Sequence, residues 1–150
     1  MINEQTHFSR FSFYFLEEGE MYIKEFSGIC QLLYPETNKI EELKGNVHFC
    51  SRSIIFEPDS HDYSIIKFHF KNFQNRPKIQ IISEKDMFNF TINKIICINP
   101  PPIYESYNAY DITSEIYLYF EFVELESVAK VIFELIDKYN YKKAFLNLIL

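Results

Sequence analysis

Tryptophan is absent from this 150-residue sequence, and glycine is scarce, with three residues. A chain so poor in glycine is neither collagen-like nor a Gly-rich linker. Long apolar runs are also missing, because no window approaches the roughly 18 apolar residues of a membrane-spanning helix. The first ten residues lack the basic segment and following apolar run of a secretory signal. We therefore expect a cytoplasmic protein.

Cysteine is equally scarce, and its spacing carries no site pattern. Cys30, Cys50 and Cys97 form no CxxC pair and have no histidine at ligand spacing. This arrangement indicates neither a disulfide framework nor a zinc site. Free cysteines that behave as small apolar side chains fit a reducing compartment. We expect no metal and no cofactor.

Positive charge is in deficit. The chain has 15 Lys and Arg against 21 Asp and Glu, which gives a net charge of -6. Binding to nucleic acid normally requires a concentrated excess of Lys and Arg, so we expect no nucleic-acid partner. The same deficit weakens any general attraction to an anionic membrane surface.

Apolar side chains are abundant. Hydrophobic residues make up 47% of the chain, including 16 Phe and 11 Tyr. This is the composition of a packed globular protein rather than a disordered one. The length fits a single domain, residues 1–150, that buries roughly 70% of the surface its unfolded chain would expose.

Apolar and polar residues alternate along several short segments, and this period of two predicts β-strands. The clearest alternation lies in residues 64–73, where Lys67, His69 and Lys71 oppose apolar residues. We expect a charged loop at 34–45, a tight connection at Ser51–Arg52, a reversal at 84–86 and an exposed Pro-rich loop at 99–113. Residues 8–16 fit either a strand or a helix. The expected strands are residues 20–33, 47–52, 53–57, 64–73, 77–83, 87–98 and 114–122.

From Val128 onward the apolar period becomes helical. The stripe consists of Val128, Val131, Ile132, Leu135, Ile136 and Tyr139. Acidic residues near its start (Glu124, Glu126) and Lys138, Lys142 and Lys143 toward its end complement a helix dipole. Antiparallel strands followed by one helix predict a mainly β fold with a C-terminal α-helix. We expect a β-sandwich or partly open barrel capped by this one amphipathic helix, as in pleckstrin-homology (PH) and GRAM-type domains.

Two segments, residues 10–26 and 44–73, carry a family resemblance. They resemble the N-terminal PH/GRAM-like region of BEACH-domain scaffold proteins, and most closely the type found in the factor associated with neutral sphingomyelinase activation. Residues 74–124 show no comparable match. The apolar ending, AFLNLIL, suggests a fragment of a longer BEACH-type protein. The matching positions are Gly45, Cys50, Ser51, Arg52, Ser53, Ile54, Ile55, Phe56, Glu57, Pro58, Asp59, Ser60, Ile65, Ile66 and Lys67.

Residues that could support chemistry do not form a recognisable site. His48 and Cys50 share a strand face, but the rise of about 6.6 Å over two residues is too long for a nucleophile and its base. His61 lies between acidic residues in a loop without a fourth metal ligand, and such a loop is typical of a turn. The Glu57-Pro58-Asp59 motif is expected to end a strand, with both carboxylates solvated or accepting backbone hydrogen bonds. The sequence therefore predicts a protein without catalytic activity.

The fold class raises the question of lipid headgroup binding. The expected first hairpin loop offers Lys39 and Lys44, but three glutamates in the same segment cancel them. A second basic group consists of Lys67, Lys71, Arg76 and Lys78, which we regard as a candidate contact for anionic lipid or a partner. Alternating lysines on an outward strand face also occur simply for solvation or edge protection.

Taken together, these features predict a noncatalytic interaction or scaffold module. The resemblance implies a protein partner or an adjoining BEACH domain, and a role in membrane trafficking or signalling adaptor assembly. The alternative is a phosphoinositide-dependent membrane-targeting domain, which would place a cytoplasmic protein peripherally on membranes. An enzyme would require polar groups that converge in an internal cavity.

Overall fold

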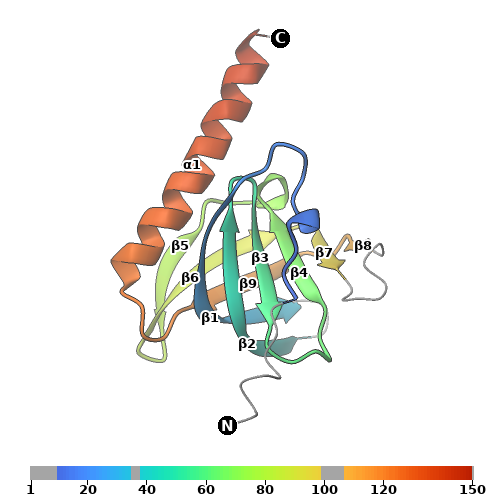
Figure 1. Ribbon diagram of the computed structural model, residues 1–150. Helices are drawn as coiled ribbons and strands as arrows, with labels where there is room; N and C mark the ends of the chain where they lie inside the picture. The colour runs from blue at the N-terminus through green and yellow to red at the C-terminus, as the bar shows by residue number, and fades with distance from the viewer. Residues whose placement is uncertain (1–9, 35–37, 99–106, 150) are drawn as a thin grey trace.

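The computed structural model describes residues 10–34, 38–98 and 107–149. Within them, nine strands form one antiparallel sheet in the order β5-β6-β9-β1-β2-β3-β4-β7-β8, and a long helix follows (Figure 1). Two short 3-10 helices are η2 (Phe13–Phe15) and η3 (Phe70–Asn72). The other elements are β1 (Tyr22–Tyr34), β2 (Lys39–Cys50), β3 (Ser53–Pro58), β4 (Ile65–His69), β5 (Lys78–Ile82), β6 (Lys85–Ile92), β7 (Ile95–Ile98), β8 (Tyr107–Tyr110), β9 (Ser114–Tyr119) and α1 (Leu125–Ile149).

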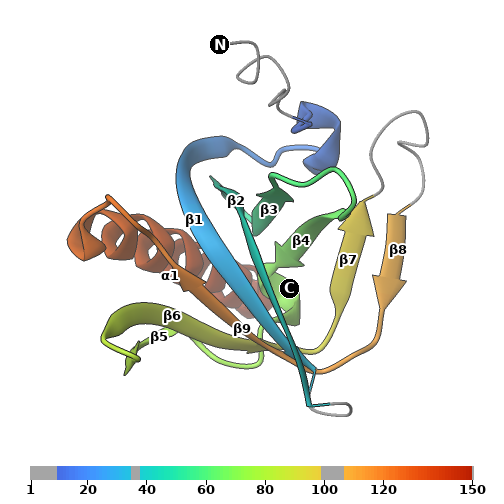
Figure 2. The same cartoon turned by 90° about the horizontal axis from the view of Figure 1, so that it is seen from below.

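The sheet curls into a half-barrel (Figure 2). Strand β1 pairs with β2 on one side and with β9 on the other, and β9 pairs in turn with β6. The early and late parts of the chain are therefore joined in one sheet whose edges, β5 and β8, remain apart. The predicted mainly β fold with a C-terminal helix is confirmed, in the form of the partly open barrel.

The β1–β2 hairpin is longer than predicted. The expected charged loop is wrong for residues 39–45, because they form the first half of β2 and pair with β1. In this half Leu43 is buried and Glu42 is exposed. Glu42 accepts hydrogen bonds from Gln31 on β1 (2.7 Å) and Tyr119 on β9 (3.2 Å). The charged side chain of Glu42 thus lies on the outer face of a strand rather than in a loop.

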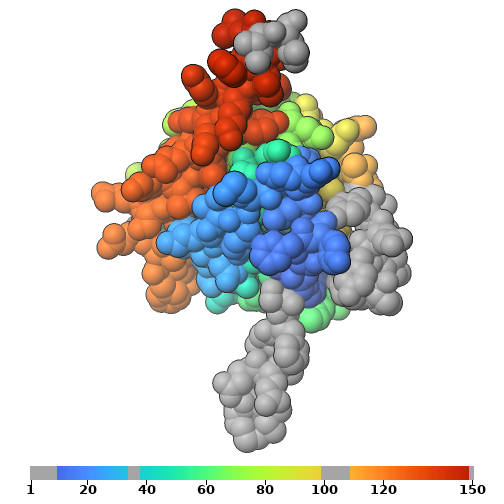
Figure 3. Space-filling view, turned by 45° about the horizontal axis from the view of Figure 1, so that its top comes forward, coloured from blue at the N-terminus to red at the C-terminus, as the bar shows by residue number. Residues whose placement is uncertain are grey.

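Apolar side chains fill the inside of the half-barrel. Every strand from β1 to β9 except β5 and β8 contributes to this core, and α1 contributes Val128, Ile132 and Ile136, which are at most 2% exposed. The predicted apolar stripe of the helix is confirmed. Residues 140–148 of α1 are exposed, and the helix extends past the sheet (Figures 1 and 3).

The N-terminal segment covers part of the outer face of the sheet. Phe15 of η2 packs with Cys50, Ile55, Ile65 and Ile98, which point away from the barrel interior. This second apolar layer buries β3 and β4 on both faces. The strand predicted within residues 64–73 is confirmed as β4, but the expected outward face for Lys67 is wrong. All five residues of β4 are buried, and the strand ends at His69, where η3 begins.

Two further strand predictions need correction. The expected single strand at 87–98 is divided into β6 and β7, because Asn93 donates its backbone N–H to Asn72 in η3 (3.0 Å) instead of continuing the ladder. The expected loop at 99–113 contains the edge strand β8, while its proline run lies outside the described residues. The β5–β6 reversal occurs at Ser83 and Glu84, whose φ angles of 51° and 63° suit a tight two-residue hairpin turn.

Candidate interaction groove

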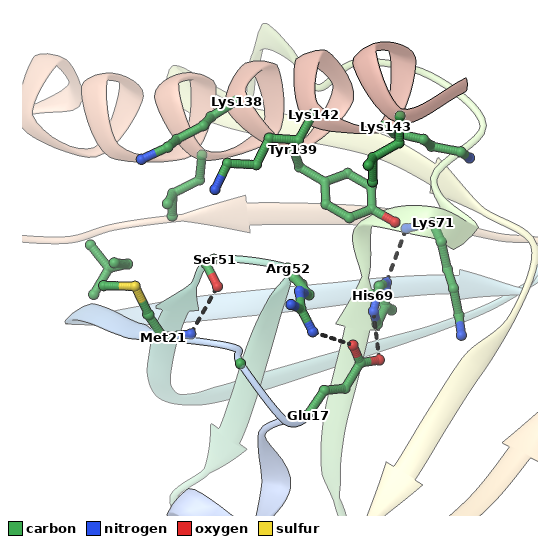
Figure 4. A pocket seen from close by; sticks show the side chains of 14 residues that line it. Glu17, Met21, Ser51, Arg52, His69, Lys71, Lys138, Tyr139, Lys142 and Lys143 are labelled. Atoms are coloured by element: carbon green, nitrogen blue, oxygen red, sulfur yellow. Dashed lines mark hydrogen bonds and ion pairs between the residues drawn. The ribbon is translucent and has the colours of Figure 1, made fainter. Parts of the chain in front are cut away.

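A groove of about 540 Å³ lies between the second half of α1 and one end of the half-barrel (Figure 4). The helix forms one wall. The other wall combines the turn between η2 and β1, the start of β1, the β2–β3 turn, the end of β4 and η3. We name it the helix groove. Its residues are Leu135, Lys138, Tyr139, Lys142, Lys143 and Leu146 on α1, and Glu17, Gly19, Met21, Ile23, Ser51, Arg52, His69 and Lys71 opposite.

Apolar side chains line the groove without being buried. Met21 is 63% exposed, Ile23 44% and Leu146 53%. Met21 directly precedes β1, Ile23 is the second residue of β1, and both line the groove. The backbone N–H of Met21 donates to Ser51 Oγ (2.8 Å), which ties the start of β1 to the β2–β3 turn. Tyr139 packs edge-on against His69, with ring centroids 6.0 Å apart.

One carboxylate, Glu17, faces the groove, and it is already paired. Arg52 Nη1 donates to Glu17 Oε2 at 3.2 Å, and His69 Nε2 lies 2.8 Å from Glu17 Oε1, although outside good hydrogen-bond geometry (Figure 4). Burial alone would raise the pKa of Glu17, but His69 and Arg52 outweigh it and lower this pKa. Glu17 is therefore ionised at neutral pH and offsets the charge of Arg52.

Four lysines of the groove lack such a partner. Within the described part of the chain, no carboxylate lies within ion-pair distance of Lys71, Lys138, Lys142 or Lys143. The last three line the groove from α1, and Lys143 projects about 100° around the helix axis from its neighbour Lys142. A chain with a net charge of -6 thus concentrates uncompensated positive charge beside exposed apolar side chains.

A buried ion pair holds the wall opposite the helix. Lys67 Nζ lies 3.2 Å from Glu20 Oε1 and donates to the carbonyl of Phe15 (2.7 Å). Glu20 also accepts from Ser53 Oγ (2.7 Å) and from the backbone N–H of Glu17 (2.9 Å). The side chains of Lys67 and Glu20 are 6% and 0% exposed. This network fixes the turn that carries Glu17 onto β3 and β4.

The structure does not gather the four predicted contact residues into one patch. Lys67 is buried, so its predicted place on an outward strand face is wrong. Lys71 lies in the helix groove. Arg76 donates from Nε and Nη2 to both carboxylate oxygens of Asp137 on α1 (2.9 and 3.0 Å). Lys78 begins the edge strand β5 and is exposed.

The groove cations were only partly visible in the sequence. Lys138, Lys142 and Lys143 have the signature of a helix end, and Arg52 appears as a turn residue. Their shared location follows from the path of α1 across the end of the half-barrel, which no local pattern encodes. The available signal was three lysines within six residues on the apolar side of an amphipathic helix.

The side chains of His48, Glu57 and Cys50, which could in principle support catalysis, are engaged in hydrogen bonds or core packing. His48 Nε2 contacts Glu57 Oε1, and His48 Nδ1 contacts the hydroxyl of Tyr22, both at 2.8 Å. Glu57 is 4% exposed and accepts from the backbone N–H of Arg10, which confirms for it the predicted alternative of a carboxylate that accepts a backbone hydrogen bond. Burial raises the pKa of the Cys50 thiol to about 12, with a further contribution from Glu20. A thiol with this pKa is a poor nucleophile at neutral pH.

Comparison with known families gives one match that spans nearly the whole chain. The model of the FAN protein N-terminal PH domain matches residues 1–144. This match confirms the resemblance carried by residues 10–26 and 44–73. It also covers residues 74–124, where the sequence alone showed no comparable match. PH domains are generally noncatalytic interaction modules that commonly bind proteins or phosphoinositides. Among the described residues, α1 is not apolar enough over 18 residues to cross a membrane, and no other helix is long enough.

Proposed function

The chain belongs to the family of FAN-protein N-terminal PH domains, and from this membership we propose that it is a noncatalytic interaction module of a BEACH-type scaffold. In this proposal it acts in the cytoplasm and binds a protein partner or an adjoining BEACH domain. Its role is to assemble adaptors in membrane trafficking or signalling.

One observation carries this proposal: the helix groove combines concavity, exposed apolar side chains on both of its walls and four lysines without a carboxylate partner among the described residues. Exposed apolar side chains framed by polar ones are typical of interaction sites. Among the described residues, the barrel interior is filled mainly by Phe, Ile and Leu side chains. The chemistry-bearing His48, Glu57 and Cys50 are engaged in packing or hydrogen bonds, which supports a role without catalysis.

The experiment is a calorimetric titration of this domain with a separately produced BEACH domain of a FAN-type scaffold. We expect saturable association at physiological salt. An unrelated PH domain of similar net charge serves as the control. Absence of association with the BEACH domain, together with flotation on vesicles, would replace this proposal by the alternative.

That alternative is phosphoinositide-dependent membrane targeting, and the exposed cations Lys71 and Lys78 favour it. Flotation with and without phosphatidylinositol bisphosphate in the vesicles tests it. The variant to use is Lys71→Glu/Arg76→Glu/Lys78→Glu, with Lys67 left intact because it is buried. The matched control reverses three exposed lysines elsewhere: Lys24→Glu/Lys44→Glu/Lys130→Glu. Lipid-dependent flotation that only the first variant loses would establish membrane targeting.

A further inference from the structure

We propose that the helix groove binds an acidic, amphipathic helical segment of a protein partner. The inference rests on the proposed function and names the chemistry of the partner. The groove offers exposed apolar side chains on both walls and unpaired lysines on the α1 wall, so its complement presents apolar residues on one face and carboxylates beside them.

The dimensions of the groove suit a helix. The α1 wall runs from Leu135 to Leu146, and eleven residues at about 1.5 Å each give about 16 Å, or three helical turns. Recognition of a helix in a groove uses anchors at positions i, i+3, i+4 and i+7, which span about two to three turns. The volume of about 540 Å³ accommodates the side chains of such a face while its backbone stays outside.

The charge of the groove selects an acidic ligand. Lys138, Lys142 and Lys143 have no carboxylate partner among the described residues, and Glu17 is held by Arg52 and His69. A ligand carboxylate therefore meets lysines that have no competing internal partner. The rest of the chain carries the negative excess, which would repel an acidic segment that approached elsewhere.

The arrangement of the lysines favours a protein segment over a membrane. Lys138 to Lys143 spans about 7.5 Å along the helix axis, so these charges form a row rather than converging on one phosphate. Met21 belongs to the wall facing α1 (Figure 4), and Ile23 also lines the groove. A segment that lies in the groove can contact α1 and the opposite wall at once, whereas a flat bilayer would contact the rim.

The test is a fluorescence-polarisation titration with a synthetic 16-residue helical peptide that carries Leu on one face and Glu beside it. A matched peptide has Gln in place of every Glu. We expect the Glu peptide to bind at least about tenfold more tightly than the Gln peptide. Lys142→Glu should weaken binding of the Glu peptide at least about tenfold. The control, Lys130→Glu, makes the same charge change at an exposed position in the first half of α1, outside the groove, and should leave binding within about twofold.

A charge exchange guards against variants that merely misfold. The Lys138→Glu/Lys142→Glu variant should bind a peptide with Lys in place of Glu more tightly than it binds the Glu peptide. Equal binding of the Glu and Gln peptides, or equal losses in Lys142→Glu and Lys130→Glu, would overturn the proposal. So would anionic vesicles that bind with the same dependence on Lys142 while the peptide does not. If the BEACH domain binds the Lys142→Glu variant normally, this inference falls while the proposed function stands.

Discussion

Replacing Lys67 by Met tests the buried network that holds the wall of the helix groove. Methionine keeps most of the apolar stem, so the change removes the ammonium group without leaving a large cavity. Glu20 then keeps its buried position, with its side chain 0% exposed, and has lost its counter-charge. Its remaining donors are Ser53 Oγ and the backbone N–H groups of Glu17 and Arg52.

The expected loss of stability is large for a single substitution. Removing one partner of a buried ion pair costs about 3–5 kcal/mol. Because Glu20 keeps three hydrogen-bond donors, we expect a loss in the free energy of unfolding at the lower end of this range, about 3 kcal/mol. With a urea dependence of about 2 kcal/mol per M, the unfolding midpoint should fall by about 1.5 M.

Two further variants complete the urea experiment. Lys71→Met is the control, because Lys71 is exposed and unpaired, and its effect should stay within about 0.5 kcal/mol. The double variant Glu20→Gln/Lys67→Met removes both charges and should be more stable than Lys67→Met alone. A midpoint for Lys67→Met that matches Lys71→Met would refute the buried pair. A double variant less stable than the single would refute the assignment of the loss to Glu20.

Three other predictions follow from particular residues. Burial lowers the pKa of His69, so the unfolded chain takes up its proton first, and the free energy of unfolding should fall as pH decreases below about 6.5; urea midpoints at pH 7.5 and 5 should separate more in the wild type than in His69→Asn, and equal separations would count against this. A Cβ at Gly45 would lie 2.1 Å from the Glu57 carbonyl oxygen, so Gly45→Ala should cost about 1–3 kcal/mol, and an unchanged thermal midpoint would contradict it. Mass spectrometry after brief thiol labelling should find Cys50 unmodified, since burial raises its pKa to about 12, and the half-buried Cys97 modified first; the reverse order would disprove the packing.

Local sequence patterns predicted those helices and strands whose apolar residues recur at one regular spacing. The terminal helix was visible because its apolar residues recur at helical spacing, and they are the residues that pack inside the barrel. The strands around β1, β3 and β9 were visible because turn residues bound them. The family resemblance also has a physical counterpart, since Gly45 sits where β2 crosses against the backbone of Glu57. That close approach explains why the pattern requires glycine there.

Long-range contacts decided what the patterns missed. Lys67 and His69 alternate with apolar residues as exposed side chains would, yet both are buried because the N-terminal segment forms a second layer over β4. The stretch from 87 to 98 reads as one strand, but a hydrogen bond from Asn93 to η3 divides it. The groove draws on residues 17–23, 51–52, 69–71 and 135–146, and no sequence window contains them together.

The most direct test of the account is an NMR shift map of this domain during titration with the BEACH domain of a FAN-type scaffold. The account predicts that the perturbed backbone amides cluster in the helix groove, at residues 17–23, 51–52, 69–71 and 135–146. Perturbations confined to the edge strands β5 and β8, with the groove amides unchanged at saturation, would contradict it.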